Sequence, residues 1–256
     1  SVYSLTNLKL ERMVMVAQDK QLPILAHPNE ELIEAARKAA VRIAGRSSKA
    51  DRERRVPIEN IQDLHEAGLL TVVIPRNLGG TEADLVTQVA VYELIGGACA
   101  STAWVMGNHS VFCTRAMGMM GEDSHFLIRD VVDNGALISH AAIPGGDTKR
   151  SSGGFIASGR WPFVSGSNLS TWIFLSTMVE DENRFMIIPK SQPGLTIEPT
   201  WQAMAARGSM TNDVLLDKVF VPEGMAPIAR RPAPHEPWLP DGPAVLKVPT
   251  KARVWM

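Results

Sequence analysis

The spacing of apolar residues changes near residue 135, and this change restricts the fold more than any other feature of the sequence. Before it, apolar residues recur at helical spacing, as in Leu32, Ile33 and Ala36. After Asn134-Gly135, short runs of β-branched and aromatic residues alternate with turn residues. Because helices come first and strands second, the order excludes a βαβ alternation and predicts an α+β chain with separate helical and β domains.

The expected elements follow from these runs and from the residues that bound them. Pro57 suits the first turn of a helix, and Gly68 suits the end of the same helix. The sequence predicts helices over 32–55, 58–67, 85–95, 102–119 and 122–132. It predicts strands over 137–143, 154–163, 171–179, 184–188, 195–201 and 213–221.

Six short strands at this spacing indicate a β-sandwich or a barrel. We therefore expect an all-helical N-terminal domain over residues 1–134 and a middle β domain over 135–224. Residues 225–256 are expected to form a linker, because 230–237 is rich in proline.

Composition limits the function classes. The formal net charge of −1 provides no field that would recruit nucleic acid or an anionic membrane. No apolar run is long enough to cross a bilayer. The two cysteines, Cys99 and Cys113, form no disulfide framework, and the histidines show no metal-ligand spacing, so we expect no metal site. These features predict a protein of the reducing cytoplasm.

The segment Gly159-Arg160-Trp161-Pro162-Phe163-Val164-Ser165-Gly166 is the strongest candidate for a binding site. Aromatic side chains can cover the face of a flat heteroaromatic ligand, and a hydroxyl can hydrogen-bond a ring nitrogen. We expect only one of Trp161 and Phe163 to meet the ligand. The alternative is that both aromatic residues belong to the core and that Ser165 caps a turn.

Several motifs together resemble the acyl-CoA dehydrogenase superfamily. One is the stretch from His65 to Leu70 that continues through Ile74-Pro75 to Gly79-Gly80, and another is Ala206-Arg207-Gly208-Ser209 leading to Val219-Phe220-Val221-Pro222. The resemblance covers about residues 35–224. It implies a helical N-terminal domain, a middle β domain and a C-terminal four-helix bundle, and we expect that bundle to be absent from this chain.

Within the superfamily, the two-component flavin monooxygenases, which hydroxylate phenols and related ring compounds, resemble the chain most. Pro144-Gly145, Gly153-Gly154 and the segment from Gly159 to Gly166 follow their pattern. The Thr-Glu pair of true acyl-CoA dehydrogenases is replaced here by Ala142-Ile143. The phenol hydroxylases tend to continue with Asp and His where this chain has Asn168 and Leu169, so the substrate stays open.

The resemblance implies roles for individual residues. Ser165 is implied as the hydroxyl donor near flavin N5, and His109 as a group that hydrogen-bonds or deprotonates a substrate hydroxyl; these two are the catalytic candidates. Without the resemblance, His109 would be read as a core histidine and Arg207 as a surface residue of a turn. The implied cofactor-binding residues are Ala142, Pro144, Gly145, Trp161, Phe163, Ser165, Arg207 and Ser209. The implied substrate-binding residues are Trp104, Asn108, His109 and Phe112.

The function implied is that of the oxygenase component of a two-component monooxygenase. Its cofactor would be FAD or FMN, taken up as reduced flavin from a separate flavin reductase, and O₂ would react with an aromatic or other cyclic small molecule. The chain would form a homo-oligomer, a homotetramer where the bundle is present. Two alternatives stay open: an FAD-dependent acyl-CoA dehydrogenase, and a non-catalytic flavin-fold subunit.

Overall fold

The computed structural model describes residues 28–229, and the predicted linker over 230–256 lies outside them, as does the segment 1–27. Helices occupy the first part and strands the second, with the change between Asn134 and Ile138. The helices are α2 (Glu30–Arg52), α3 (Ile58–Glu66), α4 (Leu85–Ala98), α5 (Ala100–Met120) and α6 (His125–Asn134). The expected α+β fold class is confirmed, and the division into domains at residue 135 stays a proposal.

Local capping sets several of the helix ends. The Asn29 side chain accepts a hydrogen bond from the backbone N–H of Leu32 and starts α2, and Asp84 caps α4 through the N–H of Thr87. Gly135, in the left-handed region with a φ of 66°, ends α6. At this glycine a Cβ would also lie 2.9 Å from the ring of His65, so both conformation and close packing require glycine.

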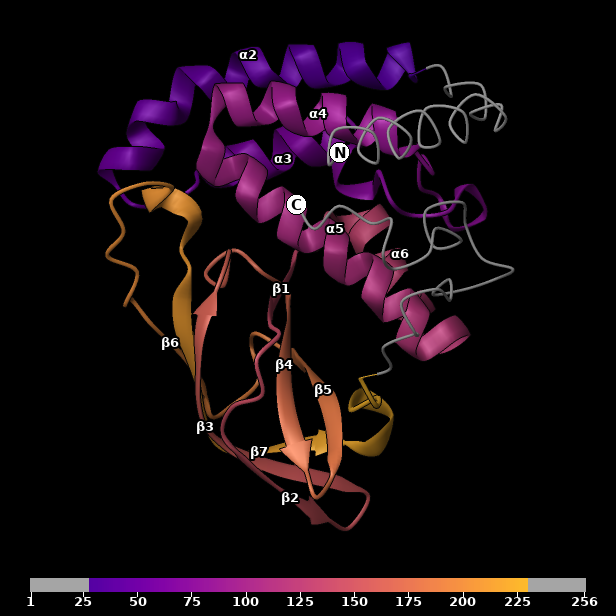
Figure 1. Cartoon of the computed structure of the whole chain (residues 1–256), viewed down its shortest axis with the longest axis vertical. Helices are drawn as coiled ribbons and strands as arrows, with labels where there is room; N and C mark the ends of the chain where they lie inside the picture. Colours follow the sequence, from indigo (N-terminus) through magenta and orange to yellow (C-terminus); the bar gives the residue numbers. More distant parts are fainter. Residues whose placement is uncertain (1–27, 230–256) are drawn as a thin grey trace, which may run out of the picture.

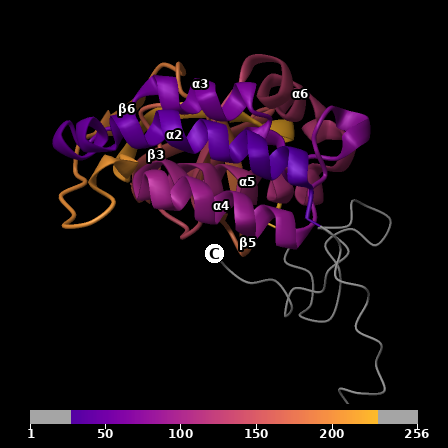
Figure 2. The same cartoon turned by 90° about the horizontal axis from the view of Figure 1, so that it is seen from above.

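The helices gather at one end of the molecule and the strands at the other (Figure 1). Seen from above, α2, α4 and α5 form a layer over the strands (Figure 2). Their shared core is fully buried and includes Ile43, Leu64, Leu70, Ile95 and Met106.

The strands form two sheets. One has the order β1 (Ile138–Ala141), β4 (Trp172–Val179), β5 (Glu182–Pro189), with β1 parallel to β4 and β4 antiparallel to β5. The other is antiparallel, with the order β2 (Asp147–Ser151), β3 (Gly154–Val164), β7 (Asn212–Pro222), β6 (Leu195–Glu198).

Strand β4 shows how the β part joins the helices. Ile173 and Leu175 pack into the core between the two sheets, and Phe174 between them in sequence joins the helical core. This follows from the two-residue period of a strand. The predicted strand positions agree closely, except that β2 was missed because it is mostly exposed and polar and forms only through its pairing with β3.

Candidate functional site

A chain of hydroxyl groups lies where α5 meets the second sheet. The Ser165 Oγ accepts a hydrogen bond of 2.9 Å from the indole N–H of Trp104, and it lies 3.0 Å from the Thr211 Oγ1. The Thr211 hydroxyl lies 2.8 Å from the Ser209 Oγ. The three hydroxyl residues are buried, whereas Trp104 is 50% exposed, so the chain runs from the interior to a surface that a ligand can reach.

Backbone geometry brings these residues together. The N–H of Gly166, directly after Ser165, donates 2.8 Å to the carbonyl of Ser209. Gly166 has a φ of 74°, and a Cβ there would lie 3.0 Å from Val105 of α5. Only glycine permits this close approach of the turn to the helix.

The two aromatic residues of the candidate segment point in different directions. Residues two apart in a regular strand share a face, but Trp161 is fully buried and Phe163 is 65% exposed. The register of β3 against β7 shifts between Trp161 and Val164, and Phe163 has a φ of 61°. This bulge with a left-handed residue turns Phe163 outward, where its ring packs edge-on against Trp201.

Asp213 of β7 holds the bulge. Its carboxylate accepts hydrogen bonds from the Phe163 N–H (3.3 Å) and the Thr200 hydroxyl (2.9 Å), and it pairs with Arg160 at 2.6 Å. Burial opposes ionisation of this carboxyl, but the bonds from Arg160, Thr200 and Phe163 outweigh it and lower the pKa of Asp213. The Asp213 carboxylate thus holds the left-handed Phe163 through its backbone N–H and is itself held in place by Arg160 and Thr200.

Trp161 supports the turn that carries the other cofactor candidates. Its indole N–H donates 2.7 Å to the carbonyl of Ser176, and that carbonyl also accepts from the N–H of Gly145. A Cβ at Gly146 would collide with the Trp161 ring. Trp161 therefore lies beneath the turn, whereas Pro144 is exposed and Ala142 and Gly145 are partly exposed above it.

Arg207 opens the short 3-10 helix that leads to Ser209. Its guanidinium lies 3.5 Å from the carboxylate of Asp51, and its buried Nε has no hydrogen-bond partner among residues 28–229. Ala206 and Met210, on either side of the 3-10 helix, have left-handed φ angles of 47° and 49°. The turn thus aims Ser209 inward at Thr211 and leaves Arg207 partly exposed.

The geometry of His109 differs from that of the expected catalytic base. The residue is fully buried, its Nε2–H donates to the Leu70 carbonyl, and its Nδ1 accepts the N–H of Ile138. Burial lowers the pKa of His109 to about 4, although the bond to Leu70 opposes this. Both nitrogens are occupied by backbone, so this side chain ties α5 to the first sheet, and we no longer assign it a catalytic role.

The other substrate candidates on α5 differ in their exposure. Phe112 is fully buried and stacks on the ring of His140, with ring centroids 3.6 Å apart. Its position is that of a core residue. Asn108 is partly exposed and donates from its side chain to the Trp104 carbonyl one turn earlier. Of the four candidates, Trp104 and Asn108 therefore stay available to a ligand.

The imidazoles of His109 and His140 predict a specific pH dependence of stability. Burial first, and Arg115 second, lower the pKa of His140 to about 3. The pKa values of His140 and His109 in the folded protein lie below the ordinary value of 6.5, so the unfolded chain binds more protons at pH values between the folded and unfolded pKa values. The contribution of the two histidines to the free energy of unfolding is therefore fully present above pH 6.5 and is lost as the pH drops toward 4.

Replacing His140 by phenylalanine tests this dependence. Each histidine contributes a slope of up to about 1.4 kcal/mol per pH unit, so the variant should lose about half of the decline between pH 6 and 5. Denaturant titrations across this range measure it, with the values above pH 7 as the reference. An unchanged slope would contradict the enclosure of His140.

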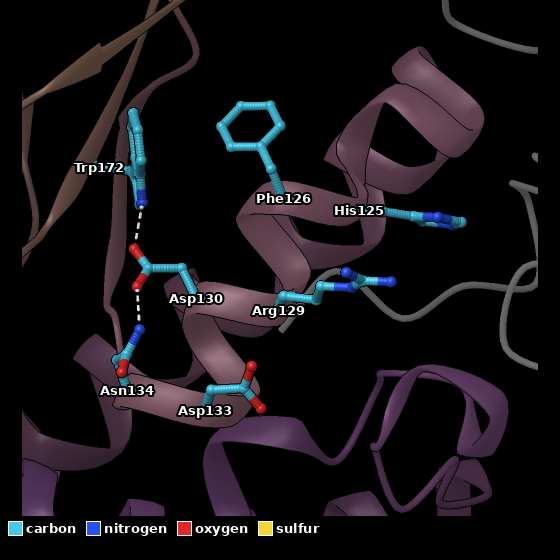
Figure 3. A pocket seen from close by; sticks show the side chains of 7 residues that line it. All are labelled: His125, Phe126, Arg129, Asp130, Asp133, Asn134 and Trp172. Carbon is cyan, nitrogen blue, oxygen red and sulfur yellow. Dashed lines mark hydrogen bonds between the residues drawn. The ribbon is translucent and has the colours of Figure 1, made fainter.

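A separate hollow of about 700 Å³ lies beside α6, lined by His125, Phe126, Arg129, Asp130, Asp133, Asn134 and Trp172 (Figure 3). The Asp130 carboxylate accepts from the indole of Trp172 at 2.7 Å and from the Asn134 amide at 2.8 Å. The side chains of His125 and Arg129 point away from Trp172 (Figure 3). Because the Asp130 carboxylate is already bonded to Trp172 and Asn134, and His125 and Arg129 point elsewhere, we do not assign the hollow as the functional site.

Sequence reasoning missed Thr211, Asp213 and Trp201. Thr211 comes two residues after the Arg207-Gly208-Ser209 stretch, and this spacing from Ser209 was the available signal. No sequence signal marks Asp213 as the partner of Phe163, because the bulge exists only in the paired strands. Within residues 28–229, no three His, Cys, Asp or Glu side chains gather as metal ligands. No helix of this part of the chain is long and apolar enough to cross a membrane.

Comparisons with known proteins agree with this architecture. Residues 28–125 match the family described as acyl-CoA dehydrogenase, N-terminal domain. The FADH(2)-dependent resorcinol hydroxylase, oxygenase component, of Rhizobium sp. is 30% identical over 211 residues, which is 78% of this chain and 50% of the relative. The flavin-dependent monooxygenase, oxygenase subunit HsaA, of Rhodococcus jostii is 28% identical over 185 residues, covering 69% and 47%.

A solved structure shows the same arrangement. XiaF from Streptomyces sp., in complex with FADH2 and glycerol, superposes with a TM-score of 0.70 at 26% identity, covering 77% of this chain and 50% of that one. The chain spans about half the length of the curated relatives it matches.

Proposed function

We propose that this chain, whose residues 28–125 match the acyl-CoA dehydrogenase N-terminal domain family, acts in the oxygenase component of a two-component flavin-dependent monooxygenase. Reduced FAD or FMN from a separate reductase would bind at the hydroxyl chain. An aromatic or other cyclic small molecule would be the substrate, and O₂ the oxidant. The homologous hydroxylases support this proposal, as does the placement of Ser165.

The single observation that carries the proposal is the hydrogen bond between the Ser165 hydroxyl and the indole of the exposed Trp104. Trp104 is 50% exposed and Phe163 is 65% exposed, and the Ser165 hydroxyl contacts both the Trp104 indole and the Thr211 hydroxyl. Apolar faces with one hydrogen-bonding group fit a flat ring system that carries ring nitrogens. When bound, the flavin would supply the oxygen chemistry, and Ser165 would hold a proton at the ring nitrogen N5.

The other candidate residues would contact the flavin and the substrate. Pro144, Gly145 and Ala142 would contact the flavin through the turn above Trp161, and Arg207 would offer a cation to a flavin phosphate or to a neighbouring subunit. We propose a homotetramer and retain the cytoplasm as the predicted compartment. Asn108 and Trp104 would contact the substrate.

An acyl-CoA dehydrogenase is the second candidate, favoured by the family match of residues 28–125. The position of the Thr-Glu pair typical of that branch is occupied by Ala142-Ile143, and Ile143 is 76% exposed. An aliphatic side chain there offers no hydroxyl or carboxylate to a ligand, which favours the monooxygenase. A non-catalytic flavin-fold subunit is the third candidate.

An anaerobic titration with reduced FMN and FADH2, followed by mixing with O₂ and a panel of phenols, separates the candidates. We expect binding of reduced flavin and formation of hydroxylated product. Reduction of bound oxidised flavin by an acyl-CoA, without O₂, would replace the proposal by the dehydrogenase. Absence of binding by either flavin would favour the non-catalytic subunit.

A further inference from the structure

Phe163 has a backbone conformation that the stability of the fold does not explain. Its φ of 61° lies in the left-handed region, where a bulky side chain costs free energy. Its ring is 65% exposed, so burial returns little of this cost. A large apolar side chain that is held outward at a cost to stability points to a role in binding.

Two successive residues of β7 hold this ring and a second one. The Asp213 carboxylate accepts the backbone N–H of Phe163 at 3.3 Å, and the Asn212 side-chain oxygen accepts the backbone N–H of Trp201 at 3.0 Å. Phe163 belongs to β3 and Trp201 to the loop after β6, and β7 lies between these two strands in the sheet. One central strand therefore fixes the backbone of both aromatic residues.

The two holding side chains have little freedom themselves. Asn212 and Asp213 are both 7% exposed. The Asn212 amide donates 2.7 Å to the Asn168 side chain, which leaves its oxygen to accept from the backbone. The Asp213 carboxylate also accepts from Arg160 and Thr200. The two aromatic residues therefore cannot shift without breaking hydrogen bonds of buried groups, which is costly.

The rings of Phe163 and Trp201 form an aromatic corner. Their centroids are 6.4 Å apart, their planes lie at 84° to each other, and Trp201 is partly exposed. A flat ligand that stacks on one of two perpendicular rings meets the edge of the other, and both arrangements are favourable for aromatic systems. We infer that Trp201 is a further ring-binding residue beside Phe163, and that Asn212 and Asp213 are positioning residues that hold this corner.

The inference rests on the proposed function, because its flat ligand is the ring system of the flavin. The probe is oxidised FMN, with the Kd measured by quenching of its fluorescence. Phe163→Ala and Trp201→Leu should each raise the Kd about two- to tenfold, the range of one aromatic contact. Asp213→Ala should raise it about two- to fivefold, because the Phe163 ring is then no longer held. Asp213→Asn keeps an oxygen that can accept from Phe163 and should restore part of the affinity.

A positioning role also predicts that Asp213 acts only through the two rings. In the double variant Phe163→Ala, Trp201→Leu, the further change Asp213→Ala should therefore leave the Kd unchanged. An equal increase of the Kd with and without the rings would mean that Asp213 supports the fold in general, and it would overturn the inference.

Glu182→Gln is the matched control. Glu182 is a strand carboxylate paired with an arginine, as Asp213 is, but its partner is Arg184 of β5. We expect its Kd to equal that of the unchanged protein. If Asp213→Ala does not fold, Thr200→Val removes one bond to the same carboxylate and should raise the Kd by a smaller amount.

A readout without flavin separates this inference from the proposed function. The ring current of Phe163 acts on the ring protons of Trp201, which the Trp201→Leu variant assigns among the six tryptophans. Phe163→Ala should shift these resonances, and Asp213→Ala should shift them in the same direction. Unchanged resonances in Asp213→Ala would overturn the positioning role, whether or not FMN binds.

The two possible failures are distinct. If the unchanged protein binds FMN and every ring variant binds it equally well, the proposed function stands and the aromatic corner is overturned as a binding site. If the unchanged protein binds no flavin, the proposed function and the ring contact fail together, and the Trp201 resonances still decide the positioning role of Asp213.

Discussion

Replacing Ser165 by alanine is expected to lower the yield of hydroxylated product per reduced flavin by about tenfold, while binding of reduced flavin changes little. The reason is that the variant removes the Ser165 hydroxyl, which ends the Ser209–Thr211–Ser165 chain beside the exposed Trp104. Losing one hydrogen bond to a group with developing charge corresponds to about 1.4 kcal/mol or more. The measurement is the ratio of hydroxylated product to hydrogen peroxide at fixed flavin consumption.

Ser170→Ala is the matched control for this experiment. Ser170 is as buried as Ser165 and lies in the same turn, but its hydroxyl donates 2.8 Å to the Ser167 carbonyl and contacts no group of the hydroxyl chain. We expect its product ratio to equal that of the unchanged protein. Equal losses of stability and product yield in Ser165→Ala would instead identify Ser165 as a structural turn residue.

Replacing Trp161 by alanine should lower the free energy of unfolding by about 3–5 kcal/mol, the largest stability effect we predict. The indole is fully buried in the core between the sheets, and the turn at Gly145-Gly146 packs on it. The substitution leaves a cavity. The Ser176 carbonyl loses the indole N–H as a donor but keeps the N–H of Gly145. Chemical denaturation measures the loss.

Phe163→Ala is the control from the same strand. Phe163 is 65% exposed, so its removal should cost less than about 1 kcal/mol. A similar loss for both variants would show that Phe163 is buried and that the bulge opposite Asp213 does not form as described. A small loss for Trp161→Ala would contradict its place beneath the turn.

The order of helices and strands and most of their positions were predictable from the sequence. Local periodicity and end signals such as Asn29, Gly68 and Gly135 depend on neighbouring residues alone, and the structure confirms the fold class they indicate. β2 could not be predicted in this way, because its polar residues become a strand only beside β3.

The candidate site was predictable as a segment but not as an arrangement. The Ser165 motif stood out in the sequence, whereas its partners Trp104 and Thr211 lie 61 and 46 positions away. His109 was chosen for its residue type, and the structure gives both its nitrogens to backbone groups. A sequence shows which side chains can bond, but not which bonds the packed backbone has already used.

The sequence by itself therefore determined most of the secondary structure and the chemical groups present, because both depend largely on residue type and short-range spacing. The tertiary structure decided that Trp161 is core and Phe163 is surface, because strand pairing inserts a bulge between them. It also decided that Ser165 lies at the end of a hydroxyl chain beside the exposed Trp104, because only the packing of α5 against the turn before β7 brings these side chains within hydrogen-bond distance.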